Sequence, residues 1–168
     1  MTPEQLNRII FPAAFAVMPA EFDTPAARAL LISIALQESR LKYRIQIVNR
    51  SGLWWEKPHG PARGRWQFEL GGGVAGVMAH PTSRSFAAEV LDTLNYPFAA
   101  SVVHEALAFD DILATCFARL LLRTLPGALP DKGQHDESWG QYISAWRPGR
   151  PHPETWRGFY DTAWGVVG

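Results

Sequence analysis

The chain has little cysteine and no surplus of charge of either sign, and each shortage excludes a class of protein. Its single cysteine, Cys116, rules out an internal disulfide framework, and its apolar neighbours predict a small buried residue. Lysine and arginine total 16, as do aspartate and glutamate, so the formal net charge is zero. We therefore expect no nucleic-acid partner, because domains that bind nucleic acid usually carry a basic excess.

Long hydrophobic runs are also missing. No stretch reaches the roughly 18 apolar residues that cross a membrane, so no membrane partner is expected. The apolar stretch from Ile9 to Met18 follows Glu4, is interrupted by Pro12 and has only Arg8 as a nearby positive charge. These features favour a mature helix over a secretion signal. The sequence therefore predicts no signal peptide, and a protein that stays in the cytoplasm where it is made or leaves it by another route.

Metal and cofactor patterns are lacking as well. The five histidines show no paired spacing typical of metal ligands, and one cysteine cannot build a zinc finger. Gly71, Gly73 and Gly76 formally match the glycine pattern of dinucleotide-binding loops, but no clean buried strand precedes them and Pro81 limits a following helix. We expect a flexible rim or a tight turn there, and we expect no metal and no cofactor.

The residues that are present indicate a mainly α fold. A length of 168 residues with 47% hydrophobic content predicts one folded domain over 1–168. Thr2-Pro3 and Thr24-Pro25 each place a capping hydroxyl before a proline at the first helical position, which predicts two helix starts. The second of these helices is predicted to end near Leu41, and further helices are predicted over 82–94, 97–107, 110–125, 138–146 and 153–165. Residues 42–80, rich in tryptophan, proline and glycine, predict a loop or short hairpin inserted after the second helix.

Glu38 is the most informative residue of the helix that starts at Thr24. It lies four residues after Ile34 and seven after Leu31, so it falls on the same apolar stripe, one turn from the helix end. A carboxyl group on a buried stripe loses solvation, which raises its pKa and lets it act as a general acid near neutral pH. The alternative is a structural role, in which Glu38 pairs with an arginine such as Arg63 or Arg40 or extends to solvent at the helix end.

Two segments around Glu38 carry a family resemblance. The run Ala35-Leu36-Gln37-Glu38-Ser39-Arg40-Leu41 resembles the glutamate–serine motif of the soluble lytic transglycosylase and goose-type lysozyme superfamily. In that family a loop and an Ala-Arg-Gly-Leu-Met-Gln type segment follow, and here the matching segment is Ala62-Arg63-Gly64-Arg65-Trp66-Gln67-Phe68-Glu69. A weaker likeness is Tyr142-Ile143-Ser144-Ala145-Trp146-Arg147-Pro148-Gly149-Arg150, which lacks the family's asparagine and has two residues inserted.

The resemblance implies a lysozyme-like α+β fold that acts on the glycan strands of peptidoglycan. It implies that Glu38 is the catalytic acid, that Ser39 supports the local backbone, and that Gln67 and Tyr142 belong to the substrate site. A lytic transglycosylase needs one glutamate, which protonates the glycosidic oxygen and then takes the proton of the sugar's own C6 hydroxyl. A hydrolase often needs a second carboxylate, and Glu69 is the candidate; its alternative role is that of a solvated strand residue.

Tryptophans provide a further indication of a sugar site, because pyranose rings stack on indole faces. Trp54 and Trp66 lie in the segment of the predicted hairpin and are expected to bind substrate. The competing interpretation places at least one of these side chains in a core beneath a long loop. The tryptophans at 139, 146, 156 and 164 recur at helix-like intervals, which is more typical of packing residues.

The sequence thus favours a peptidoglycan-cleaving enzyme, either a lytic transglycosylase or a muramidase. Small relatives without a signal peptide are common in bacteriophages, so the resemblance implies location in the host cytoplasm before lysis or in the virion, with other virion proteins as possible partners. The alternative is a virion or tail structural protein without activity on a lysozyme-like fold. The neutral charge favours this alternative, because many wall hydrolases are basic to suit an anionic polymer.

Overall fold

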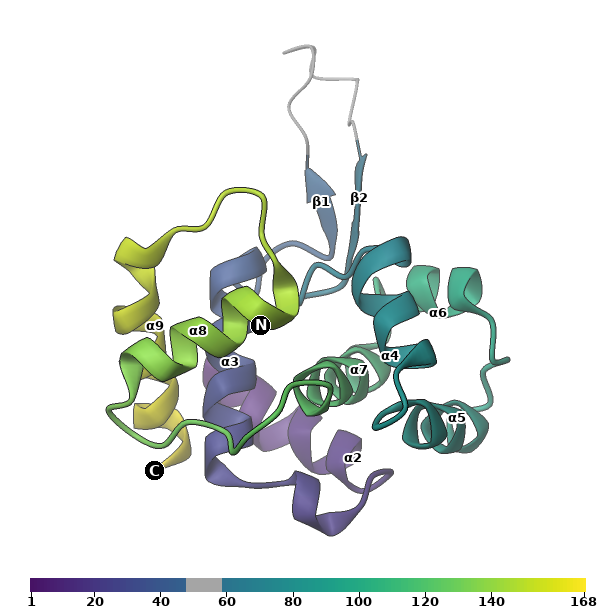
Figure 1. The fold of residues 1–168 in the computed structure, drawn as a ribbon, viewed down its shortest axis with the longest axis horizontal. Helices are drawn as coiled ribbons and strands as arrows, with labels where there is room; N and C mark the ends of the chain where they lie inside the picture. Colours follow the sequence, from purple (N-terminus) through teal and green to yellow (C-terminus); the bar gives the residue numbers. More distant parts are fainter. Residues whose placement is uncertain (48–58) are drawn as a thin grey trace.

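The structure is a computed structural model that describes residues 1–47 and 59–168. It is mainly helical, with helices over 63% of the chain and one small antiparallel sheet in the described part (Figure 1), as the sequence predicted. The helical elements, in chain order, are α1 (Pro3–Gln5), η1 (Leu6–Ile10), α2 (Phe11–Phe15), η2 (Ala20–Phe22), α3 (Pro25–Ser39), η3 (Leu70–Val74), α4 (Ala75–Ala79), α5 (Arg84–Thr93), α6 (Ala100–Ala106), α7 (Asp111–Arg123), α8 (His135–Trp146) and α9 (Pro153–Val167). The strands are β1 (Ile45–Ile47) and β2 (His59–Arg63).

Both predicted threonine–proline helix starts are confirmed. The Thr2 hydroxyl accepts a hydrogen bond from the backbone N–H of Gln5, whose side chain in turn accepts from the Thr2 N–H. The Thr24 hydroxyl caps α3 by accepting from the N–H of Ala27 at 3.1 Å. Each cap satisfies donors that the first turn of a helix leaves unpaired.

Helix α3 lies at the centre of the fold. It packs against α9 on one side and contacts α7 on another, and its residues from Ala29 to Ala35 are all buried. The prediction of a single apolar stripe was therefore too narrow, because this helix is covered on most sides. Arg40 adopts a left-handed backbone conformation with φ of 55°, which ends the helix at Ser39 rather than near Leu41.

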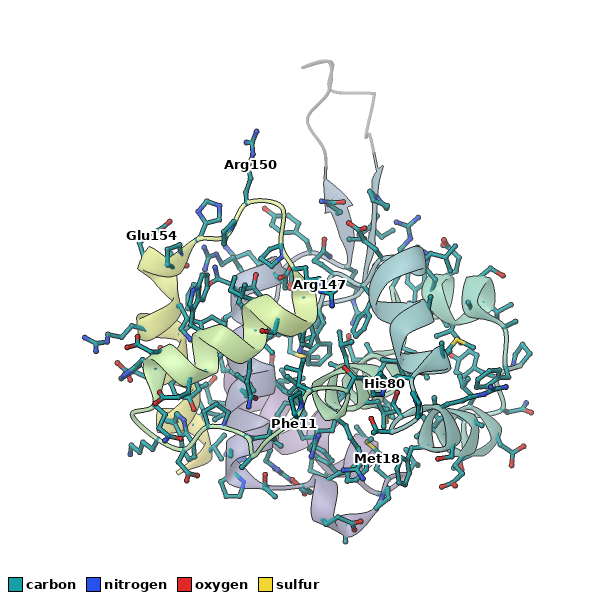
Figure 2. The ribbon with its side chains drawn as sticks, in the orientation of Figure 1. Phe11, Met18, His80, Arg147, Arg150 and Glu154 are labelled. Carbon is teal, nitrogen blue, oxygen red and sulfur yellow. The ribbon has the colours of Figure 1, made fainter. Side chains whose placement is uncertain are left out.

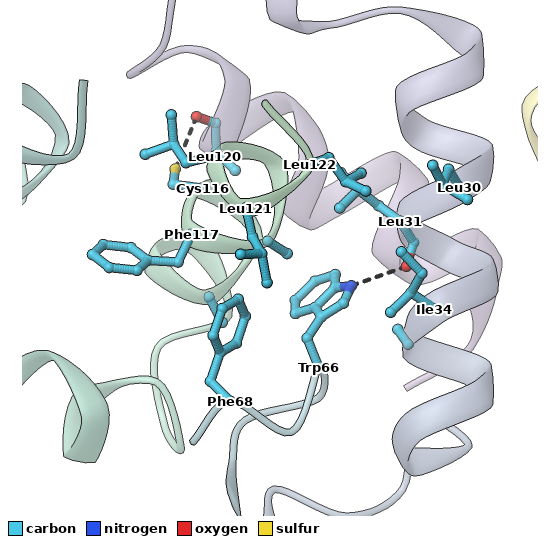
Figure 3. Packing of buried hydrophobic residues seen from close by; sticks show 14 of the residues in the cluster. Leu30, Leu31, Ile34, Trp66, Phe68, Cys116, Phe117, Leu120, Leu121 and Leu122 are labelled. Atoms are coloured by element: carbon cyan, nitrogen blue, oxygen red, sulfur yellow. Dashed lines mark hydrogen bonds between the residues drawn. The ribbon is translucent and has the colours of Figure 1, made fainter. Parts of the chain in front are cut away.

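Helix α7 supplies the other half of the core. The Asp110 side chain accepts hydrogen bonds from the N–H groups of Ile112 and Leu113, both at 2.9 Å, and so caps the helix. Figure 3 shows Leu121 of α7 pointing toward Phe68 and Trp66 of the hairpin segment, whereas Leu120 and Cys116 lie on the opposite side of the helix. Cys116 is fully buried here, as predicted, and burial raises the pKa of its thiol to about 12, so it stays a neutral thiol.

The predicted hairpin after the second helix is confirmed. Strands β1 and β2 pair antiparallel, with Ile45 opposite Arg63, and they project from one end of the helical body (Figure 1). A tight turn follows β2, and its first residue must be glycine. Gly64 has φ of 73°, and a Cβ there would come within 2.5 Å of the Leu107 carbonyl oxygen.

The glycine-rich segment after the hairpin differs from the prediction. Residues 70–79 form the short helices η3 and α4 rather than a flexible rim or a tight turn. Gly73 is required by close packing, because a Cβ at this position would meet the Phe68 ring at 2.5 Å. Gly73 therefore lets the helix approach an aromatic side chain, a need that depends on tertiary contacts and not on the local sequence.

Candidate active site

Glu38 occupies the last turn of α3, where the helix leaves the core. Its side chain is half-buried, and this burial, together with the nearby charge of Glu69, raises its pKa to about 7 against the opposing effect of a hydrogen bond from Tyr142. An ordinary glutamate would be ionised well below this pH. Glu38 therefore keeps its proton in a large fraction of molecules near neutral pH, as a general acid must.

The hydroxyl of Tyr142 holds the Glu38 carboxyl group in place. It donates a hydrogen bond of 2.7 Å to Glu38 Oε1. Burial and the charge of Glu38 raise the pKa of Tyr142 above its usual range, so the phenol remains a donor. The Tyr142 ring stacks on Trp156 with centroids 4.9 Å apart and also contacts Trp139. An aromatic cluster on α8 and α9 thus packs against the Tyr142 ring and holds its hydroxyl beside Glu38.

The alternative role for Glu38, an ion pair with arginine, does not occur among the described residues. Arg63 lies 3.4 Å from Glu105 instead, and Arg40 packs over the ring of Phe159 at 4.3 Å. The Glu38 carboxyl group is therefore partly desolvated without a compensating cation. This arrangement costs stability unless the group stays protonated, and it is typical of functional sites.

A groove with a volume of about 850 Å³ opens beside Glu38. This volume falls within the range of roughly 300–1,000 Å³ that is usual for ligand sites. Glu69, at the start of η3, lines the same groove, so two carboxyl groups face one space. The groove is lined by Glu38, Tyr43, Gln46, Ala62, Gln67, Phe68, Glu69, Gly72, Gly73, Leu121, Ala145, Trp146, Arg147, Pro148, Gly149 and Arg150.

The turn after β2 forms one wall of the groove and is tied directly to α3. The buried Ser39 hydroxyl donates to the backbone carbonyl of Arg65 at 2.7 Å. The Arg65 guanidinium returns a bond of 2.6 Å to the carbonyl of Leu41 and forms a buried ion pair with Asp111 at 3.1 Å. Gln67 lies at the tip with φ of 51°, and its side-chain amide donates to the Gly64 carbonyl at 2.8 Å. These bonds hold the turn at a set position relative to Glu38.

The structure brings together three of the predicted site residues, because Glu38, Gln67 and Glu69 all line the groove. Tyr142 contacts Glu38 but is itself buried, so it acts through the acid and does not line the groove. Trp54 lies outside the described residues.

Two residues of the predicted substrate site do not reach the groove. Ser39 is 2% exposed, and its hydroxyl bonds to backbone groups, so it supports the local backbone as the resemblance implied and does not contact a ligand. Trp66 is fully buried, and its indole N–H donates to the Leu31 carbonyl at 2.9 Å (Figure 3). The competing interpretation, that a tryptophan of this segment builds the core, is confirmed for Trp66. The local pattern could not show which side of the turn its ring would take.

Among the described residues, sequence reasoning missed two solvent-accessible aromatic side chains of the groove and two of its cations. Tyr43 is 50% exposed, and Trp146 is half-buried, with its indole N–H bonded to the Trp66 carbonyl at 2.8 Å. Arg147 and Arg150 line the groove from the loop between α8 and α9, and Figure 2 shows the Arg150 side chain extending away from this loop. The likeness of residues 142–150 to the third family segment was the signal that could have found the cations.

Other kinds of site find no support in the described ranges 1–47 and 59–168. No group of three or more histidine, cysteine, aspartate or glutamate side chains in them could hold a metal ion. No helix in the same ranges has the length and apolar character needed to cross a membrane.

In comparisons with protein family models, with curated proteins and with solved structures, nothing matches this chain.

Proposed function

We propose that this protein is a lysozyme-like enzyme that cleaves the glycan strands of peptidoglycan, with Glu38 as general acid and base. The proposal depends on one observation above all: a carboxyl group with a pKa of about 7 lies beside a groove of ligand-binding size and pairs with no cation among the residues that the structure describes. Such a group can donate a proton at the pH at which most enzymes work.

In the first step, Glu38 donates its proton to the glycosidic oxygen while the bond from this oxygen to the sugar carbon breaks. The leaving sugar departs as an alcohol, and positive charge develops on the ring that remains. The ionised Glu38 stabilises this charge, and the substrate's own N-acetyl group can share it. The Tyr142 hydroxyl bonds to Glu38 Oε1, so the other carboxyl oxygen is the one that transfers the proton.

In the second step, Glu38 accepts a proton from the nucleophile that attacks the charged carbon. This nucleophile is the C6 hydroxyl of the same sugar in a lytic transglycosylase, and water in a muramidase. Glu69 lines the same groove and is the group that would position a water molecule. The anhydro product is one water lighter than the reducing product, so mass spectrometry of the released fragments distinguishes the two reactions.

The aromatic side chains of the groove suit a sugar chain. Tyr43 on the hairpin side and Trp146 on α8 both line the groove, and both are partly exposed. Trp146 is held by its bond to the Trp66 carbonyl, so its ring offers a fixed face for a pyranose. These residues replace Trp66 in the substrate contacts expected from the sequence.

The proposal is tested by zymography on cell-wall substrate with the wild type and the Glu38→Gln variant. We expect clearing by the wild type and a loss of clearing of at least about a hundredfold in the variant, since general acid catalysis contributes about 10²–10⁴-fold. Equal clearing by both proteins, or no clearing by either on an exposed wall, would overturn the proposal.

The second candidate is a structural component of a bacteriophage particle. Exposed apolar side chains on one side of the molecule favour it: Phe109 is 73% exposed and lines a shallow depression with Ile10 and Ile112. If the wild type clears no wall and instead forms a defined complex through this depression, the structural role replaces the enzymatic one.

A further inference from the structure

Two arginines stand on the loop that closes one side of the groove, and nothing in the proposed chemistry uses them. Arg147 follows the last residue of α8, and Arg150 lies three residues on; both are exposed and both line the groove. Neither forms an ion pair among the described residues. Arg147 donates one bond of 3.3 Å from its Nε to the Ser144 carbonyl, which leaves its two terminal nitrogens available.

The backbone at Arg147 ends α8 in a left-handed conformation. The residue adopts φ of 48° and ψ of 53°, and it precedes a proline, which disfavours compact backbone conformations in the residue before it. A left-handed residue that ends a helix is most often glycine, because other residues are strained there. Arg147 therefore ends α8 in a strained turn, and this turn places its side chain at the edge of the groove.

The loop that carries Arg147 and Arg150 is also restricted in its backbone. Trp146 is fixed by its bond to Trp66, and Pro148 and Pro151 restrict the loop on either side of Arg150. A side chain on a rigid support loses less conformational entropy when it binds. Figure 2 shows Arg147 at the end of α8 and Arg150 extending outward from the loop, so the pair offers one cation near the groove and one at its rim.

We propose that Arg147 and Arg150 form an anion-binding subsite that recognises carboxylate groups carried by the glycan chain in the groove. This inference rests on the proposed function, and it adds a contact with the carboxylates of the substrate to the contacts with its sugar rings. Arginine suits the role because its planar guanidinium binds a carboxylate through two parallel N–H bonds. The chain as a whole carries no net charge, so its net charge supplies no attraction, whereas Arg147 and Arg150 place positive charge at the groove itself.

The carboxylates of peptidoglycan have two sources. One is the lactyl group of N-acetylmuramic acid, which is a free acid when no peptide is attached. The other is the stem peptide, which carries its carboxylates further from the sugar ring. The chemistry that the arginines recognise is the same for both, so the choice of probe has to separate them.

The test measures binding to the Glu38→Gln protein, which should leave the ligand intact. Three probes are used: soluble peptidoglycan strands with stem peptides, the same strands with their carboxyl groups amidated, and strands stripped of peptides by an amidase. We expect the amidated strands to bind about threefold to tenfold more weakly than the native strands at low salt, in line with two partly exposed charge contacts. A preference for native over amidated strands identifies the stem peptide, because the peptide bond blocks the lactyl carboxyl group of native strands. Stripped strands expose the lactyl carboxylate, and they identify it as the ligand if they bind more tightly than amidated strands while native strands do not.

The variant Arg147→Gln/Arg150→Gln, made in the Glu38→Gln background, should bind native and amidated strands alike. The matched control is Arg84→Gln/Arg157→Gln, which removes the same charge from exposed positions outside the groove and should keep the preference. Arg147→Gly is a second variant that relieves the strained backbone while it removes the guanidinium, so it should fold well and still reduce the preference.

The subsite is refuted if the parent protein binds neither native nor stripped strands more tightly than amidated ones, or if the groove variant retains such a preference. The outcome is separable from the proposed function. A wild type that cleaves strands without any preference refutes the subsite alone, whereas a preference that depends on the two arginines in a protein that cleaves nothing refutes the proposed reaction alone.

Discussion

At the scale of single residues, the candidate site depends on how burial and two neighbouring side chains set the protonation of the Glu38 carboxyl group. Burial raises the pKa of Glu38, the charge of Glu69 raises it further, and the hydrogen bond from Tyr142 lowers it. The opposite signs arise because the neighbouring charge disfavours the ionised form, whereas the phenol donates to it. Variants of the two neighbours should therefore change the pKa of Glu38 in opposite directions.

This gives a paired prediction for the pH dependence of cleavage. Activity should fall as the pH rises through the pKa of Glu38, because the acid form is needed. Tyr142→Phe should shift this alkaline limb to higher pH, since it removes the bond that favours the carboxylate. Glu69→Gln should shift it to lower pH, since it removes the charge that opposes ionisation. Rates measured from pH 5 to pH 9 check both.

A simple loss of folding or substrate binding in either variant would lower the rate at every pH without these opposed shifts. An NMR titration of the Glu38 carboxyl carbon gives the same comparison without turnover. Shifts in the same direction for both variants, or no shift in either, would contradict the assigned electrostatics. The mass of the product from Glu69→Gln further tells whether Glu69 positions water.

At the scale of elements, the groove depends on short segments that pack closely rather than on long helices. The hairpin turn is bound to α3 through Ser39 and to the start of α7 through the Arg65–Asp111 ion pair. Arg44, on the approach to β1, joins the same aspartate at 2.6 Å. Helix η3 then packs against Phe68, whose ring leaves no room for a side chain at Gly73. Each contact holds one wall of the groove relative to Glu38.

The packing at Gly73 yields a prediction about stability. Gly73→Ala should destabilise the protein by about 1–3 kcal/mol, because the new methyl group would overlap the buried Phe68 ring. Gly76→Ala, in the next helix, has nothing within 4 Å of the added atom and should stabilise it by about 0.5–1 kcal/mol through helix propensity. Urea unfolding of the two variants measures both effects, and a destabilised Gly76→Ala with a neutral Gly73→Ala would contradict the packing described.

At the scale of the whole molecule, the site has a cost in stability that depends on pH. The folded chain holds Glu38 at a pKa of about 7, above the ordinary value of 4.5. The unfolded chain therefore loses this proton first as the pH rises, so the free energy of unfolding falls between about pH 4.5 and pH 7. Functional sites commonly carry such a cost, and removal of the group relieves it.

Glu38→Gln should accordingly stabilise the folded protein at alkaline pH. The free energy of unfolding of the variant, measured relative to that of the wild type, should increase by about 2 kcal/mol between pH 5 and pH 8. This follows from the difference between the pKa of Glu38 in the folded chain and its pKa in the unfolded chain. Glutamine can still accept the Tyr142 hydrogen bond, so the contact with α8 is kept. Urea unfolding at the two pH values measures the change, with the exposed Glu89→Gln as control. An advantage that does not grow with pH would mean that Glu38 is not desolvated in solution.

The sequence by itself determined most of the helices and the position of Glu38. Threonine–proline starts, the Asp110 cap and the spacing of apolar residues act within a few residues of each other, so they can be found without a fold. The placement of Glu38 near a helix end and after a buried face also follows from local spacing. For the same reason the hairpin insertion was predicted, since glycine and proline interrupt helical periodicity.

Only the tertiary structure decided which side chains reach the groove. Trp66 turned into the core, whereas Trp146 lines the groove. Ser39 bonded to a turn 26 residues away, and Arg147 and Arg150 came to line the same groove as Glu38 from more than 100 residues further along the chain. The direction of a side chain at a turn depends on what packs behind it, and contacts between residues distant in the chain leave no periodic pattern in the sequence.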